Sequence, residues 1–165
     1  MTDTTPSPAP RKPSLEERRQ MKSAARLYAV QALFQMEAVG QGADKVRAEF
    51  EAHRFGAVYD DIEMAEGDAN LFRRLIDDAV TWQGKIDQAT DQALLEAWPL
   101  ARIDSVLRAL FRAAGAELCS PATPPRVVIS EFVDVARAFF PEGREPKFVN
   151  AVLDHMARQF QPEAF

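Results

Sequence analysis

Apolar side chains recur at intervals of three and four residues along most of this chain, a spacing that places them on one side of an α-helix. A clear example begins at residue 71, with Leu71, Phe72, Leu75, Ile76, Ala79 and Trp82. The one short run with strand character, residues 127–129, lies within another helical pattern. The sequence therefore predicts an all-α fold with six or seven helices.

Capping and breaking residues set the expected ends of these helices. Ser14 followed by Glu17 has the form of a capping box, so we expect the first helix to begin at Leu15 and to end near Val39, before Gly40. Asp68 and Asp104 are placed to cap two later helices. The expected helices cover residues 15–39, 43–54, 69–82, a continuation after Gly84 that Trp98-Pro99 breaks, 105–118, 127–140 and 146–160, and residues 56–67 form an acid-rich loop.

The composition changes sharply after residue 13. Four prolines fall among the first thirteen residues, and such a segment buries too little apolar surface to fold. We expect residues 1–13 to be a disordered tail and residues 14–165 to form a single helical domain, for which the 47% hydrophobic content is sufficient. No run resembles a membrane span or a secretory signal, so we expect a cytoplasmic protein without a membrane partner.

The chain lacks the residue patterns of common catalytic and metal sites. Cys119 is the only cysteine, and the two histidines, His53 and His155, are far apart in the sequence, so no metal-ligand spacing can be written. None of the seven glycines belongs to a phosphate-binding loop. Cys119 follows an apolar helix end, where a small buried side chain is a simpler interpretation than a nucleophile. We therefore expect no catalytic residue, metal or cofactor, and no enzymatic activity.

The net charge of −5 hides a basic segment near the N-terminus. Residues 11–26 carry six basic and two acidic side chains, a balance of +4, whereas the rest of the chain sums to −9. Arg18, Arg19, Lys22 and Arg26 fall within an arc of about 100° on the predicted helix. Since the second half of this helix is apolar on nearly all sides, we expect the basic half to project beyond the body. Such a cluster suits the phosphates of a nucleic acid or another polyanion, and an ordinary solvated helix start is the alternative.

A second basic cluster lies near the C-terminus, where Arg144 and Lys147 precede Phe148. Cations beside a ring suit single-stranded RNA, because unstacked bases lie on aromatic side chains while the cations hold the backbone. Phe148 and Val152 are also one helical turn apart. That periodicity alone favours a place for Phe148 in the core.

Three stretches together resemble the NusB family of bacterial transcription antitermination factors. They are Ala25-Arg-Leu-Tyr-Ala-Val-Gln-Ala-Leu-Phe34, Ile103-Asp-Ser-Val with Phe111-Arg112 and Glu117-Leu118, and Lys147-Phe-Val-Asn-Ala-Val-Leu-Asp154. The resemblance covers residues 15–160 and implies two small helical bundles packed side by side. It also implies a role without a chemical reaction: binding of boxA-type RNA, notably in ribosomal RNA leaders, together with NusE, a small-subunit ribosomal protein. The pair then joins an antitermination complex on RNA polymerase.

The same resemblance implies which residues form the site. Arg18, Arg19, Lys22 and Arg26 match the family's arginine-rich RNA-contacting segment, Phe34 stands where an aromatic residue is associated with RNA, and Lys147, Phe148 and Asn150 match a lysine-phenylalanine-valine-asparagine motif. On this ground Phe148 becomes a residue of the RNA site. Leu107 stands where some members use an acidic residue to contact NusE, so we expect the NusE contact around Leu107, with the neighbouring Asp104 or Arg108 in place of that acidic residue.

Two other functions fit the sequence. The first is a helical adaptor that binds only proteins, with its basic helix start simply solvated. The second is the NusB-like domain that precedes the catalytic domain of some RNA cytosine methyltransferases. Because the chain ends at Phe165, with no room for a methyl-donor domain, we expect a standalone factor.

Overall fold

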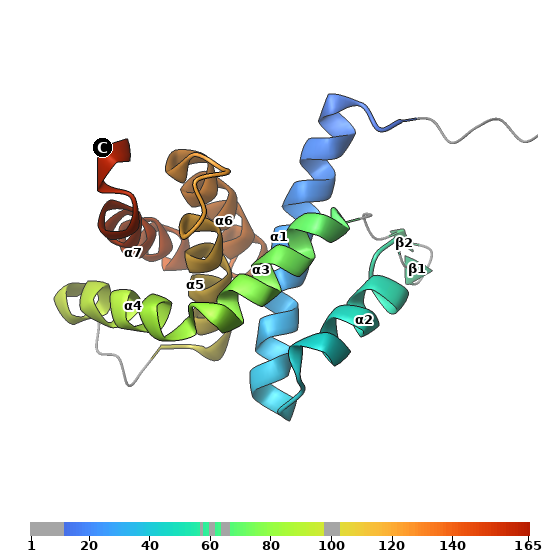
Figure 1. The fold of residues 1–165 in the computed structure, drawn as a ribbon, viewed down its shortest axis with the longest axis horizontal. Coiled ribbons are helices and arrows are strands. Elements are labelled where there is room, and N and C mark those ends of the chain that lie inside the picture. The colour runs from blue at the N-terminus through green and yellow to red at the C-terminus, as the bar shows by residue number, and fades with distance from the viewer. Residues whose placement is uncertain (1–11, 57, 60–61, 64–66, 98–102) are drawn as a thin grey trace, which may run out of the picture.

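The computed structural model describes residues 12–56, 58–59, 62–63, 67–97 and 103–165. Helices dominate this part of the chain (Figure 1), which confirms the predicted all-α fold. The elements are α1 (Leu15–Val39), α2 (Ala43–His53), β1 (Val58–Tyr59), β2 (Ile62–Glu63), α3 (Ala69–Thr81), α4 (Gln83–Ala97), α5 (Ser105–Leu118), α6 (Pro125–Phe139), α7 (Glu145–Phe160) and the 3-10 helix η2 (Pro162–Ala164). The first eleven residues of the predicted tail and the predicted break at Trp98-Pro99 lie outside the described residues.

Side-chain caps begin three helices where the sequence predicts them. The Ser14 hydroxyl accepts a hydrogen bond from the Glu17 backbone N–H at 3.1 Å, and α1 begins at the next residue. Asp68 accepts from the Leu71 N–H at 3.0 Å, and Asp104 accepts from the Val106 N–H at 2.7 Å. Each carboxylate or hydroxyl satisfies one of the backbone donors that a helix start leaves without an intrahelical partner. Gly40 ends α1 with φ at 69°, the left-handed conformation that glycine adopts without strain.

The structure differs from the sequence expectations at a few boundaries. The loop expected at residues 56–67 contains β1 and β2, which pair antiparallel with Val58 opposite Glu63, and strands of two residues are too short to show alternation. Only Trp82 separates α3 from α4, which begins at Gln83. Helix α6 begins two residues early, at Pro125, because proline has no N–H to leave unsatisfied in a first turn.

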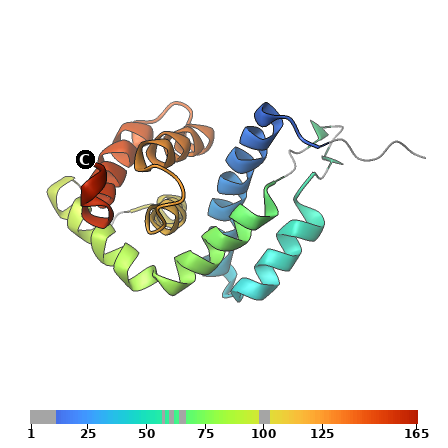
Figure 2. The same cartoon turned by 45° about the horizontal axis from the view of Figure 1, so that its top comes forward.

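Helices α1, α2 and α3 form one bundle (Figure 2), and aromatic side chains cluster between them. The Tyr28 ring from α1 stacks on Phe55 with the ring centroids 4.9 Å apart, and the Phe50 ring from α2 stacks on Phe72 from α3 at 5.8 Å. Phe55 meets Phe72 edge to face at 5.1 Å, which closes the cluster. Ring pairs in these geometries add to the stabilisation that their burial alone provides.

Helices α4 to α7 form the second bundle (Figure 2), and the two bundles share one core. Helix α5 is the centre of the molecule, because it packs against α1 and α3 on one side and against α4, α6 and α7 on the other. The buried apolar side chains form one cluster that extends from α1 to α7. Of the helices that the structure describes, none has the length and apolar character needed to cross a membrane.

Helix α1 is buried over only part of its length. Its buried residues lie between Ala24 and Leu33, whereas residues 15–20 are all exposed. Figure 1 shows the N-terminal turns of α1 rising beyond the other helices. The expectation that the basic half of this helix projects from the body therefore holds for residues 15–20, whereas Arg26, at the end of that half, is buried.

The contact between α4 and α5 depends on the missing side chain of Gly115. A Cβ at Gly115 would lie 2.5 Å from Ile86 Cγ2 and 3.2 Å from the Met156 sulfur. We therefore expect Gly115→Ala to lower the free energy of unfolding by about 1–3 kcal/mol, measured by urea denaturation.

The matched control is Gly84→Ala, in the first turn of α4. No atom lies within 4 Å of a Cβ at Gly84, so alanine has room and favours the helix. We expect this variant to be as stable as the original chain or more stable by up to about 1 kcal/mol. Equal destabilisation by both substitutions would contradict the close packing at Gly115.

Candidate nucleic-acid interface

The exposed start of α1 carries three cations, Arg18, Arg19 and Lys22, which we call the basic start. Within the described part of the chain, none of them forms an ion pair with a carboxylate. Glu16 and Glu17 lie in the same helix start, where negative charge is favourable to the helix dipole. Over the described residues, the basic start is therefore an exposed cationic surface at one end of α1.

Arg26, predicted as a fourth member of this group, has a different role. Its side chain is only 4% exposed and its guanidinium holds Glu117, which is 1% exposed, with Nε at 2.8 Å from Oε1 and 3.0 Å from Oε2. Glu131 Oε2 lies 3.5 Å from the same guanidinium and accepts a hydrogen bond from Ser23 at 2.9 Å. The structure thus corrects the prediction, because a buried guanidinium that already holds a carboxylate is not available to a phosphate.

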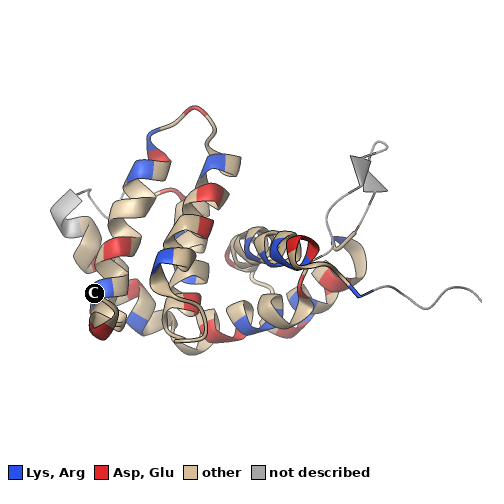
Figure 3. Ribbon diagram, turned by 90° about the horizontal axis from the view of Figure 1, so that it is seen from above, with Lys and Arg blue, Asp and Glu red and all other residues tan. Residues whose placement is uncertain are grey.

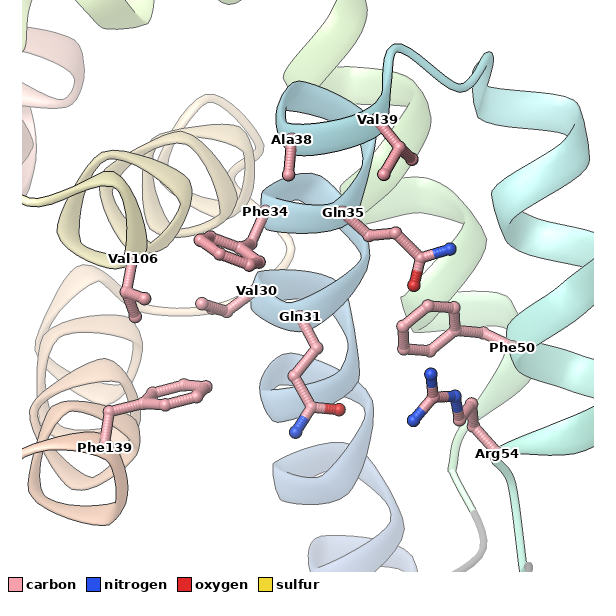
Figure 4. A pocket seen from close by; sticks show the side chains of 10 residues that line it. All are labelled: Val30, Gln31, Phe34, Gln35, Ala38, Val39, Phe50, Arg54, Val106 and Phe139. Carbon is pink, nitrogen blue, oxygen red and sulfur yellow. The ribbon is translucent and has the colours of Figure 1, made fainter.

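Phe34 lines a pocket beside the C-terminal half of α1, which we call the α1 pocket (Figure 4). The ring is 37% exposed, and the pocket has a volume of about 400 Å³. Val106 from α5 and Phe139 from α6 form the opposite wall. Because these side chains come from both bundles, the pocket exists only in the assembled fold.

Polar side chains from α1 and α2 line the rest of the α1 pocket. The Gln35 amide is engaged, since it donates to Gln41 at 2.6 Å and to Glu49 at 3.2 Å. Gln31 has no hydrogen-bond partner for its amide among the described residues. The Arg54 guanidinium lies 5.3 Å from the centre of the Phe50 ring. An open aromatic wall with an amide and a guanidinium nearby has the chemistry that unstacked bases require.

The motif at the start of α7 divides between surface and core. Lys147 and Asn150 are exposed, and Asn150 lines a hollow between α6 and α7 rather than the α1 pocket. Phe148 is half-buried, and its ring meets the Phe111 ring edge to face with centroids 6.1 Å apart. The packing favoured by periodicity is therefore present at Phe148, and only part of its ring remains accessible.

The three residues expected to contact a protein partner differ in accessibility. Leu107 is only 7% exposed and belongs to the core, so the structure corrects its assignment as a surface contact. Asp104 is exposed, although one oxygen caps α5. Arg108 is half-buried and its Nη2 lies 2.8 Å from Glu37 on α1.

Arg112 extends this ion-pair network to α4. It lies 3.3 Å from Glu37 and 3.0 Å from Asp87. The hydrogen bond to Asp87 raises the pKa of Arg112 above its usual value, although burial acts in the opposite direction. The network connects α1, α4 and α5 and has an evident structural role.

Cys119 has the properties of a structural thiol. It is half-buried at the end of α5, and burial raises its pKa above the ordinary value. Lys85 opposes this shift and Asp78 adds to it. Because a raised pKa leaves less of the reactive thiolate at neutral pH, the environment of Cys119 does not activate it as a nucleophile.

Several residues of the α1 pocket were not predicted from the sequence. Phe139 looks like an ordinary apolar helix end, and Gln31 and Arg54 carry no motif. The pair Phe139-Phe140 at the end of a predicted helix gave no signal either, because both side chains are half-buried and pack against the core. The remaining lining residues meet only through the packing of four helices.

The fold and these surfaces define a helical binding protein: over the described residues it presents an unpaired cationic helix end and an open aromatic pocket. A model of the NusB family matches residues 23–158. The transcription antitermination protein NusB of Maricaulis maris (strain MCS10) is 46% identical over 151 residues, covering 91% of this chain and 94% of the relative. The chain therefore belongs to the NusB family and is a non-catalytic transcription antitermination factor.

Solved structures with the same fold agree with this assignment. NusB of T. maritima is 28% identical, with a TM-score of 0.64 over 89% of this chain and 94% of that chain. A chain in the crystal structure of a plectonemic RNA supercoil is 25% identical, with a TM-score of 0.65 over 84% of this chain and 94% of that chain.

The buried Arg26–Glu117 pair gives a sharp stability test. We expect Glu117→Ala to cost about 3–5 kcal/mol in the free energy of unfolding, because it leaves a guanidinium buried with only the more distant Glu131. Replacing both partners, Arg26→Met with Glu117→Leu, should recover most of that loss, since no buried charge remains. Urea denaturation of the single and double variants measures both effects.

The control pair is Arg158 and Asp154 on α7, whose side chains are 59% and 43% exposed. Arg158→Ala should cost less than about 1 kcal/mol, because solvent screens an exposed pair. A loss at Glu117 no larger than the loss at Arg158 would refute the structural role of the buried pair.

Proposed function

We propose that this protein recognises boxA-type single-stranded RNA together with NusE and so supports processive transcription of ribosomal RNA. In this proposal the basic start and Lys147 hold the RNA backbone, the α1 pocket receives a base, and Asn150 hydrogen-bonds a base or phosphate. The protein itself carries out no reaction and acts by assembling the RNA with protein partners on RNA polymerase.

The observation that carries the proposal is the exposed charge of Arg18, Arg19 and Lys22, which form no ion pair with a carboxylate of the described residues. The chain has a net charge of −5, yet these three cations project together at one end of the molecule. Binding of phosphates releases the counterions that surround RNA, and this release favours association with exposed arginine and lysine. Folding alone gives no reason to gather cations at a helix N-terminus, where the helix dipole opposes them.

The α1 pocket supplies the sequence-reading part of the proposal. A base that leaves the RNA stack finds the Phe34 ring, and the Gln31 amide offers both a donor and an acceptor to the base edge. Amide and aromatic contacts of this kind discriminate among bases, whereas phosphate contacts do not.

We assign the NusE contact to the surface around Asp104 and Arg108. Both residues begin α5 beside Val106, which lines the α1 pocket. A partner bound there would lie next to the RNA and could contact both. This arrangement accounts for an expected increase in RNA affinity when NusE is present.

The first test removes the charges of the basic start. Fluorescence anisotropy should give a slope of log affinity against log salt of about −3 for the original chain. The basic start and Lys147 together supply four cations, which neutralise about four phosphates. The triple variant Arg18→Gln, Arg19→Gln, Lys22→Gln should bind boxA-type RNA at least about tenfold more weakly, with a slope near about −0.7.

The control removes three cations elsewhere, Lys45, Arg73 and Arg74 on α2 and α3, and therefore changes the net charge equally, although it also removes the exposed ion pair of Arg73 with Glu51. Its RNA affinity should stay close to that of the original chain. If the triple variant at the basic start keeps full affinity for RNA and loses NusE, the protein is a helical adaptor that binds only proteins. No preference for boxA over a scrambled RNA, even with NusE, would reject the proposed function.

A second test addresses the aromatic contact. Phe34→Ala should weaken boxA binding by about tenfold or more, since stacking on a side chain contributes about 1–3 kcal/mol per base. The salt slope should not change, because no phosphate contact is lost. Trp82→Ala is the control, as Trp82 is a comparably exposed ring, 46%, at the junction of α3 and α4. Equal effects of the two variants would contradict a base site at Phe34.

A further inference from the structure

A second polar depression lies between α6 and α7, and we call it the α6–α7 hollow. Its volume is about 370 Å³. Its polar lining consists of Arg126, Ser130 and Arg137 from α6 and Asn150 and Asp154 from α7, over a floor of Ile129 and Val133. Only Asn150 belongs to the residues that the family resemblance assigns to RNA.

The regular spacing of α6 places the donors of the hollow on one face. Arg126, Ser130 and Arg137 are separated by four and seven residues, so successive turns present them in the same direction. Figure 3 shows α6 and α7 side by side, joined by the turn between them, with basic segments on both helices. Lys147 precedes Asn150 by one turn on α7, and both residues are exposed. An RNA strand held at Lys147 therefore lies at the entrance of the hollow.

The charges in the hollow favour an anion. Arg126 is exposed and forms no ion pair with any described residue. Arg137 pairs with Asp134 at 2.7 Å, but both side chains are 64% exposed, and such pairs exchange readily with other partners. The one carboxylate of the lining, Asp154, is already bound by Arg158 at 2.9 Å. The guanidinium groups of Arg126 and Arg137 thus line the hollow. The charge of Asp154 is balanced by Arg158, which is not part of the lining.

We propose that the α6–α7 hollow binds backbone phosphates of RNA that extends beyond the boxA segment, an inference that rests on the proposed function. Arg126 and Arg137 neutralise the phosphates, and the Ser130 hydroxyl donates a hydrogen bond to their oxygens, next to Asn150, which holds the boxA segment at the edge of the hollow. Contacts of this kind carry no sequence information. The hollow therefore adds affinity for longer transcripts without changing the sequence that is recognised.

The test compares a minimal boxA-type RNA with two longer RNAs, extended by several nucleotides of scrambled sequence at the 5′ or the 3′ end. For the original chain, one extended RNA should bind more tightly than the minimal RNA, and its salt slope should be steeper by about 1.4, the value for two phosphates. Arg126→Gln with Arg137→Gln should abolish that increment and weaken binding of the extended RNA about tenfold. Affinity for the minimal RNA should be unchanged.

Lys45→Gln with Arg74→Gln is the control of equal charge, and it should leave both affinities as they are. The inference is overturned if extension adds no affinity, or if the α6 double variant weakens both RNAs equally. Thermal unfolding of that variant establishes that its fold is intact. These outcomes are separate from failure of the proposed function, which would appear as no preference of the original chain for minimal boxA RNA over a scrambled RNA of equal length.

Discussion

The buried ion pair between Arg26 and Glu117 fixes the relation between the two bundles. It joins α1 to α5, and Glu131 brings α6 to the same point. A buried charge without its partner is strongly unfavourable, so only arrangements that keep the guanidinium against the carboxylate are stable. The position of α1 follows from this, and with it the direction in which the basic start projects. The wall that α1 contributes to the α1 pocket is fixed by the same contact.

Much of the fold was predictable because its signals are local. Ser14, Asp68 and Asp104 cap helices through hydrogen bonds to residues two or three positions away. Such contacts can be predicted because both partners lie in the same short stretch of sequence. Helical periodicity identified the core for a similar reason. The two-residue strands β1 and β2 were missed, because no periodic pattern can develop over so few residues.

The candidate site was predictable only where exposure follows from a single helix. Arg18, Arg19 and Lys22 lie beyond the packed part of α1, so their position on one helix was sufficient. Arg26 lies on the same arc, but its burial depends on a carboxylate 91 residues away. Leu107 fits a core position equally well by periodicity, and family resemblance drew attention to it for another reason. The α1 pocket, which four helices form together, leaves almost no local trace in the sequence.

The junction at Trp82 affects how a long RNA strand would bind. Only this residue separates α3 from α4, so the two bundles are joined there without a flexible linker. The shared core and the buried ion pair hold the same two bodies together from the other side. The separation between the α1 pocket and the α6–α7 hollow is therefore a fixed length. A flexible strand that occupies both needs at least enough nucleotides between them to span that length.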